Sequence, residues 1–135
     1  MITVTKHLAF CAAHRLCGHE GKCRNVHGHN YTVEVELTAP QLDHVGRVID
    51  FSVIKERLGA WIDDNWDHAY LGEQADPILG LLKERGMKVA VVEDGEPTAE
   101  HMAAQLYRQA CKVLEDERVD VVALRIYETP TSRAE

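Results

Sequence analysis

Apolar and polar residues alternate in two segments near the N-terminus, residues 2 to 14 and residues 27 to 38. A period of two residues is typical of a strand with one buried face, because successive side chains point to opposite sides of a sheet. Both segments are therefore predicted to be strands of an antiparallel sheet. If the alternation holds to the strand ends, His14, His27 and His29 lie on the apolar face.

Three segments show the spacing of amphipathic helices, with apolar residues three and four positions apart. The first runs from Phe51 to Ile62, the second ends near Gly86, and the third carries apolar residues from Met102 to Leu114 on one face. Each begins at a residue that can accept a hydrogen bond from a free backbone N–H of the first turn. These capping residues are Asp50 or Ser52, Asp76 followed by Pro77, and Thr98.

Two further apolar runs, residues 87 to 92 and residues 119 to 128, are typical of strands, and the last residues, TPTSRAE, are expected to form a short tail. The predicted order is strand, strand, helix, helix, strand, helix, strand. That order predicts an α+β domain in which helices cover one face of an antiparallel sheet. A chain of 135 residues has the usual size of one domain, so residues 1–135 are expected to share a single core.

Composition and charge exclude several classes of protein. No apolar run approaches the ~20 residues of a membrane span, and the N-terminus alternates instead of showing the apolar centre of a secretion signal. A formal net charge of −7 repels polyanions, and no basic stripe outweighs it, so we expect neither a nucleic-acid nor a membrane partner. The four cysteines lack the spacing of a disulfide framework, which favours reduced thiols and a cytoplasmic protein.

His14, His27 and His29 are unusual residues for the apolar face of a strand pair. A buried imidazole without a partner costs ~1 to 3 kcal/mol, and three protonated rings would repel one another. A divalent metal removes both penalties, because neutral imidazole is a good zinc ligand and positions i and i+2 of a strand project together. Gly28 is expected where the backbone passes close to the site. Three histidines with one open position are typical of catalytic Zn²⁺.

Two other interpretations of these histidines remain open. Each ring can be hydrogen-bonded separately in the core or a loop, which is the usual state of an isolated histidine. Alternatively, Cys23 can be a fourth ligand, which would make a closed structural site. Replacing Cys23 by alanine separates the two kinds of zinc site, because a structural site would lose its metal whereas a catalytic one would keep the metal and lose turnover.

Five motifs in this order, FCAAHRL, CRNVHGHNY, WDH, PTAEH and YET, resemble those of the 6-pyruvoyl tetrahydropterin synthase family. The resemblance runs over nearly the whole chain, although the segment from Glu73 to Glu96 carries no motif. Cys23 stands four positions before the first histidine of HGH, which is similar to the 6-carboxytetrahydropterin synthase branch of 7-deazapurine (queuosine-type) biosynthesis. The resemblance implies a tunnelling fold, in which subunits join their sheets into a barrel, commonly as a homo-hexamer with sites between neighbouring chains.

The resemblance also implies roles for seven residues. They are His14, His27 and His29 as zinc ligands, Cys23 as the catalytic thiol, Asp67 and His68 as its proton-relay partners, and Glu128 as the anchor of the pterin. The pKa of a free thiol is about 8.5. Cys23 therefore needs nearby cations that lower this pKa if it is to act as a base. Adjacent side chains such as Asp67 and His68 often diverge, and Glu128 can be a strand-end residue that turns into solvent, so both readings stay open.

Thr98, Glu100 and Arg24 are weaker candidates for contacts with the substrate. Thr98 and Glu100 also fit an ordinary helix start, with a capping hydroxyl and an acid in the first turn. Arg24, with Arg15 and Lys22, adds positive charge near the histidines of an acidic chain and can receive a triphosphate, although flexible surface charge is the commoner interpretation.

The reaction that the resemblance implies starts from 7,8-dihydroneopterin triphosphate. Zn²⁺ acts as a Lewis acid, Cys23 and His68 transfer protons, and triphosphate leaves. Carbon–carbon cleavage then releases acetaldehyde and gives 6-carboxy-5,6,7,8-tetrahydropterin. One alternative is a 6-pyruvoyl tetrahydropterin synthase, which stops after triphosphate elimination. A second alternative is a non-catalytic, zinc-stabilised binding or assembly module, in which the Cys23 thiolate would bind the metal.

Overall fold

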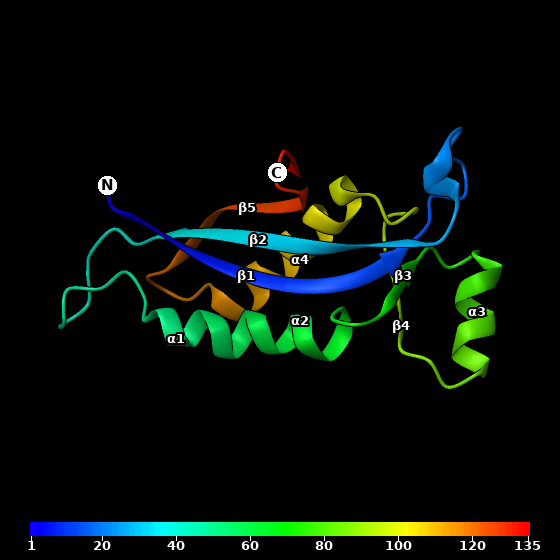
Figure 1. Ribbon diagram of the computed structural model, residues 1–135. Helices are drawn as coiled ribbons and strands as arrows, with labels where there is room; N and C mark the ends of the chain where they lie inside the picture. The colour runs from blue at the N-terminus through cyan, green and yellow to red at the C-terminus, as the bar shows by residue number, and fades with distance from the viewer.

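The two alternating segments form the longest strands of the protein, β1 (Thr3–His14) and β2 (His27–Thr38), in the computed structural model that describes residues 1–135 (Figure 1). They pair in antiparallel register along their whole length, and the ladder ends with His14 opposite His27. The even positions of β1 grow progressively more buried toward this end, whereas the odd positions stay more exposed. The predicted alternation is therefore confirmed.

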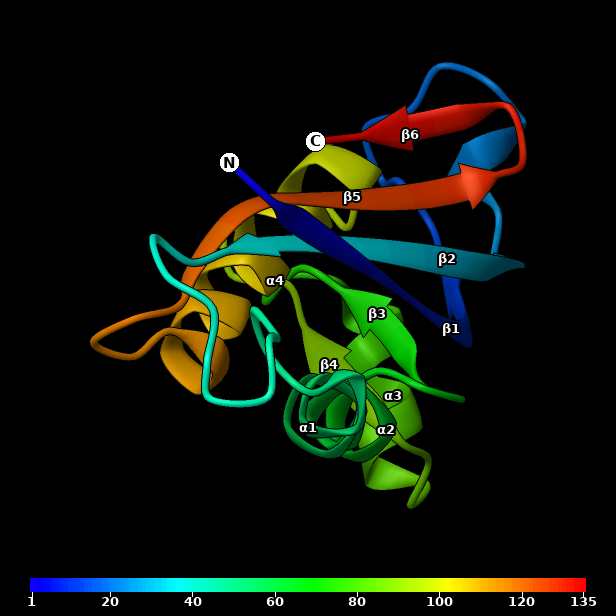
Figure 2. The ribbon, with the colours of Figure 1, turned by 90° about the vertical axis from the view of Figure 1, so that its left-hand side faces the viewer.

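Four shorter strands complete a six-stranded sheet of order β4-β3-β1-β2-β5-β6 (Figure 2). β5 (Asp120–Thr129) pairs antiparallel with β2, and β6 (Ser132–Ala134) pairs antiparallel with β5, so the expected C-terminal tail is partly an edge strand. β3 (Tyr70–Gly72) pairs with β1, and β4 (Val89–Val91) pairs with β3, both in parallel. The sheet is thus mixed, not wholly antiparallel as the sequence predicted.

The segment after Asp50 forms one continuous helix in three parts, α1 (Phe51–Ile54), the π-helical segment η2 (Lys55–Gly59) and α2 (Ala60–Asn65). The Asp50 carboxylate accepts a hydrogen bond from the backbone N–H of Ser52, which confirms Asp50 as the capping residue. The helix runs alongside the sheet in Figure 1 and contributes buried apolar residues to the core.

Two further helices, α3 (Pro77–Glu84) and α4 (Ala99–Leu114), begin at the predicted caps. The Asp76 carboxylate and the Thr98 hydroxyl each accept a hydrogen bond from a backbone N–H of the first turn. A single 3₁₀ turn, η1 (Lys22–Arg24), lies in the loop between β1 and β2. None of the helices combines the length and the apolar character that a membrane span needs.

A core of 24 buried residues fills the space between the sheet and its helices, which confirms the predicted α+β arrangement. One irregularity changes which residues of β5 face this core. The pairing with β2 skips Val122, between Val121 and Ala123, so Val121 is buried while Val122 is 44% exposed. Beyond this bulge Ile126 is buried, and Glu128 follows it on the core-facing side.

Candidate active site

Strand register brings the three predicted histidines together. His14 is paired with His27 at the end of the β1–β2 ladder, and Ala12 is paired with His29, so all three rings lie on the core-facing side of the sheet. Their ring centroids are 4.6 to 5.2 Å apart. A Cβ on Gly28 would lie 3.1 Å from the Ala12 carbonyl oxygen, which explains the glycine between two of the histidines.

Backbone carbonyls orient two of the imidazoles. The Nδ1 of His14 lies 2.8 Å from the Pro97 carbonyl oxygen, and the Nδ1 of His27 lies 2.7 Å from that of Asn25. A carbonyl oxygen only accepts hydrogen bonds, so each Nδ1 carries the hydrogen and each Nε2 keeps a lone pair. Burial lowers the pKa of His14, with further lowering from His27, which favours the neutral form. Outer carbonyl partners of this kind are typical of metal-binding histidines.

The carboxylate of Glu128 completes a group of four ligand atoms that lie within 4.8 Å of one another. Its Oε1 is 2.9 Å from the Nε2 of His29 and 3.3 Å from the Nε2 of His14, and the Nε2 atoms of His14 and His27 are 3.1 Å apart. At Zn–N distances of about 2.0–2.1 Å, the corners of a tetrahedron are about 3.3 Å apart. The spacing of the donors therefore suits Zn²⁺.

The Nε2 of His29 supports the same interpretation. It is buried and makes no hydrogen bond, although the Glu128 carboxylate lies close to it. A neutral imidazole lone pair that faces a carboxylate is repulsive, so the arrangement calls for a cation or a proton between the two groups. A divalent metal held by the three imidazoles meets this demand.

The side chains of Asp67 and His68 contact each other, a point that their adjacency in the sequence could not decide. The Nδ1 of His68 lies 2.9 Å from Oδ2 of Asp67, and the His68 side chain is 76% exposed. The backbone N–H of Cys11 and, to a smaller extent, the His68 ring hold the pKa of the Asp67 carboxyl below its usual value. A carboxylate that orients an imidazole in this way is a general acid–base arrangement.

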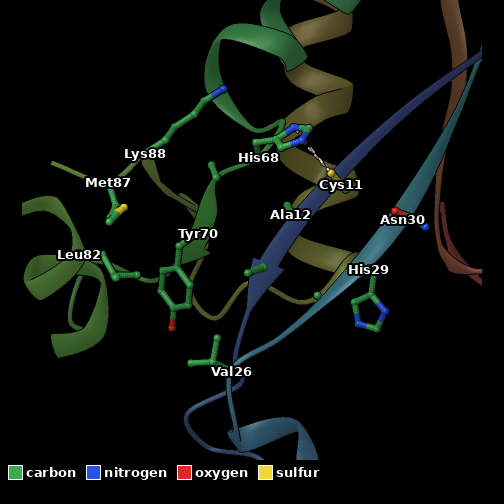
Figure 3. A pocket seen from close by; sticks show the side chains of 13 residues that line it. Cys11, Ala12, Val26, His29, Asn30, His68, Tyr70, Leu82, Met87 and Lys88 are labelled. Carbon is green, nitrogen blue, oxygen red and sulfur yellow. Dashed lines mark hydrogen bonds between the residues drawn. The ribbon is translucent and has the colours of Figure 1, made fainter. Parts of the chain in front are cut away.

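A cavity of about 590 Å³ lies beside Cys11 and His68 and extends along β1 and β2 (Figure 3). Its lining includes His68 and His29, together with Tyr70, Met87 and Lys88. A volume of this size accommodates a bicyclic ligand with a side chain. Strands β1 and β2 lie between the two imidazole rings in Figure 3, so one chain does not bring them face to face.

Comparison with known proteins identifies the family. The family model described as 6-pyruvoyl tetrahydropterin synthase matches residues 3–135. The chain belongs to this family. A 6-carboxy-5,6,7,8-tetrahydropterin synthase from Rickettsia bellii is 35% identical over 96% of each chain, and one from Haemophilus influenzae is 34% identical over 100% of this chain and 98% of its own. An uncharacterized protein from Wolinella succinogenes shares the fold, with a TM-score of 0.83 at 23% identity over 98% of this chain and 96% of its own.

Cys23, which the resemblance to the 6-pyruvoyl tetrahydropterin synthase family makes the catalytic thiol, lies in η1 and is partly exposed. Its sulfur is not among the clustered ligand atoms, where a carboxylate takes the fourth place. This placement disfavours Cys23 as a structural zinc ligand. No hydrogen bond joins Cys23 to His68 within the chain, and the thiol that contacts His68 is that of Cys11.

The weaker candidates of the family site are not among the clustered ligand atoms. Thr98 caps α4, and Glu100 is exposed and lines a different cavity with Tyr107 and Val122. Arg24 forms no ion pair, so it is free to meet an anion. Arg15 is not free, because its guanidinium is bound to the Asp76 carboxylate. The contacts are a hydrogen bond of 2.7 Å to Oδ1 of Asp76 and two longer ones to the same carboxylate.

Two features of the site were missed by reasoning from the sequence. The first is the contact between Glu128 and the imidazoles, because the same strand-end position also suits a pterin anchor. The second is Cys11, whose odd position places it on the opposite face of β1 from His14. The only sequence signal for Cys11 was its place in FCAAHRL, three residues before that histidine.

Proposed function

We propose that the protein is a zinc-dependent carbon–carbon lyase that converts 7,8-dihydroneopterin triphosphate and one water molecule to 6-carboxy-5,6,7,8-tetrahydropterin, acetaldehyde and triphosphate. The observation that carries this proposal is the convergence of three imidazoles on one point, with the Cys23 sulfur outside the ligand cluster. Relatives of 34 to 35% identity that bear the name of this synthase support it. The reaction would belong to 7-deazapurine (queuosine-type) biosynthesis.

His14, His27 and His29 would hold Zn²⁺, which when bound supplies Lewis-acid chemistry to the substrate side chain. Glu128 is 30% exposed, so its carboxylate can also accept hydrogen bonds from the amino group and ring N–H of a pterin. Burial lowers the pKa of His14, which favours the neutral form that binds a metal.

Proton transfer would fall to Cys23 and to His68. Cys23 would take a proton from the substrate side chain as a thiolate, and the partly exposed position of this residue leaves it accessible. His68, oriented by Asp67 through the 2.9 Å contact, would supply or remove the second proton. Because the two groups do not meet within one chain, we propose that neighbouring subunits of a homo-hexamer bring them together.

One incubation separates the candidate products. Zinc-loaded protein is mixed with 7,8-dihydroneopterin triphosphate, the pterin is identified by mass, and acetaldehyde and triphosphate are measured. We expect the 6-carboxy product with equal amounts of acetaldehyde and triphosphate. Triphosphate without acetaldehyde would instead identify a 6-pyruvoyl tetrahydropterin synthase, and bound zinc with no product at all would favour a non-catalytic module. The His27→Ala variant is the control for turnover that does not depend on the metal site.

A cytoplasmic location is also part of the proposal. It is supported by the state of the cysteines, because all four are free thiols, as expected in a reducing compartment. Fractionation of the source cells with an antibody to the protein checks this location.

A further inference from the structure

Cys11 contacts the Asp67–His68 pair through its backbone N–H, its backbone carbonyl and its sulfur, which also lies 3.9 Å from Oδ1 of Asp67. Its backbone N–H donates to Oδ1 of Asp67 at 3.0 Å, and its backbone carbonyl accepts from the N–H of His68 at 2.7 Å. Its sulfur lies 3.6 and 3.7 Å from the two ring nitrogens of His68 (Figure 3). One residue of β1 therefore contacts the carboxylate, the backbone and the imidazole of the pair.

The backbone of His68 is in a conformation that needs such support. His68 is the one residue other than glycine with a positive φ, at 62°. This region is costly for side chains with a Cβ, and it persists where surrounding contacts over-determine it, often at functional sites. The Nζ of Lys88 adds a second restraint, since it donates to the carbonyl oxygens of Asp67 and Asp63, each at 2.6 Å.

The sulfur of Cys11 contacts the ring at nearly the same distance from both of its nitrogens. Nearly equal distances to Nδ1 and Nε2 place the sulfur beside the imidazole, not in line with either N–H. Nδ1 is already engaged by Asp67. The His68 ring thus lines the cavity with Asp67 at its Nδ1 and the Cys11 sulfur at its side, and these two contacts restrict its rotation.

We propose that Cys11 is a positioning residue for the acid–base pair, holding the His68 imidazole against Asp67 at the edge of the cavity. This inference rests on the proposed function, in which His68 transfers a proton. The carboxylate, the strained backbone and the ring are each fixed by a different part of Cys11. The side chain of Cys11 can be replaced while both of its backbone hydrogen bonds remain.

Three cysteine variants test this role by kinetics. In Cys11→Ala the sulfur is lost, and we expect kcat to fall on the order of 10-fold, less than the roughly 10²- to 10⁴-fold effect of losing a general acid–base. KM should change by less than about 2-fold, because Cys11 positions a proton-transfer group and does not bind the substrate. Cys11→Ser should recover part of the loss. Cys111→Ala, a half-buried cysteine on α4, is the matched control and should behave as the wild type.

The ring of His68 gives a second measurement that does not depend on turnover. With isotope-labelled histidine, the wild-type spectrum should show His68 as one tautomer with hydrogen on Nδ1, whereas Cys11→Ala should show averaging between tautomers. The pH profile of kcat should shift in Cys11→Ala and recover in part in Cys11→Ser, whose His68 spectrum should lie between those of Cys11→Ala and the wild type.

Unchanged kcat, pH profile and His68 spectrum in Cys11→Ala would overturn the positioning role, even if the variant melts at a lower temperature. If Cys11→Ala does not fold, the same comparison is decided by Cys11→Ser, whose His68 spectrum must then differ from that of the wild type. A wild-type protein that does not turn over the pterin triphosphate would contradict the proposed function alone, because the His68 spectra still decide the role of Cys11.

Discussion

Replacing Glu128 by glutamine should weaken zinc binding strongly. The carboxylate lies 2.9 and 3.3 Å from the imidazole nitrogens of His29 and His14, which is the spacing of ligands around one zinc ion. Glu128→Gln keeps the size of the side chain and removes its negative charge. A role as pterin anchor alone would leave the three imidazoles intact and the affinity for zinc nearly unchanged.

The size of the expected effect follows from the contacts. Loss of an outer partner of a metal ligand typically costs about 10- to 100-fold in affinity, and Glu128 faces two of the ligating nitrogens directly. We therefore expect a loss of about 100-fold, equivalent to about 2.7 kcal/mol at about 1.4 kcal/mol per factor of ten. The partial exposure of Glu128 makes a much larger value unrealistic, because water screens the charge and can replace the lost oxygen.

Competition with a chromogenic zinc chelator at neutral pH measures this difference. Glu100→Gln is the matched control, since it removes the same charge from an exposed position that lines a different cavity. Its zinc affinity should equal that of the wild type. An affinity of Glu128→Gln within about threefold of the control would show that the carboxylate does not contact the metal, and Glu128 would then act on the substrate only.

Three further predictions concern the scaffold. Asp76→Asn should lower the free energy of unfolding at pH 7 by about 3 kcal/mol, because Arg15 loses its buried partner. Burial raises the pKa of Asp76, but its hydrogen bonds from Arg15 and Tyr70 outweigh this and leave the pKa below the usual value. The stabilisation is therefore present above about pH 4 and lost as the pH falls through the lower native value, so urea titrations at pH 7 and pH 3 should show the difference between wild type and variant shrinking in acid. Gly28→Ala should reduce bound zinc, measured by atomic absorption, because its Cβ would press on the backbone beside the histidines. Thr98→Ala should cost about 1 kcal/mol in thermal unfolding with kcat and KM unchanged, whereas a raised KM would reveal a substrate contact.

The long elements of the fold were predictable because each carries a strong local signal. β1 and β2 alternate over twelve residues each, and the three capped helices begin at side chains that satisfy free backbone N–H groups. β3 and β6 are three residues long, which is too short for a period of two to stand out. The parallel pairing of β3 with β1 also depends on where the intervening helix returns the chain, and local sequence does not record that.

The site was predictable to the same degree and for the same reason. Strand alternation places His14, His27 and His29 on one face, so their convergence needed only the correct register. The approach of Glu128 depends on β5 resuming its alternation beyond the bulge at Val122, and a skipped residue inverts any count of odd and even positions. The pairing of β5 with β2, which are far apart in the sequence, decides where this bulge lies, so only the structure reveals the position of Glu128.

β1 links the two halves of the proposed site because its alternating faces carry different chemistry. Its even face ends in His14 at the metal cluster, and its odd face presents Cys11 to the Asp67–His68 pair. A strand separates its two faces, so within one chain the proton-relay pair lies on the other side of the sheet from the imidazoles. This is the physical reason for expecting sites between subunits, since a second chain can supply the relay pair to a metal cluster whose own pair is turned away. Cys11 then matters beyond its own subunit, because the residue that orients His68 in one chain would set the proton transfer in the site of the next.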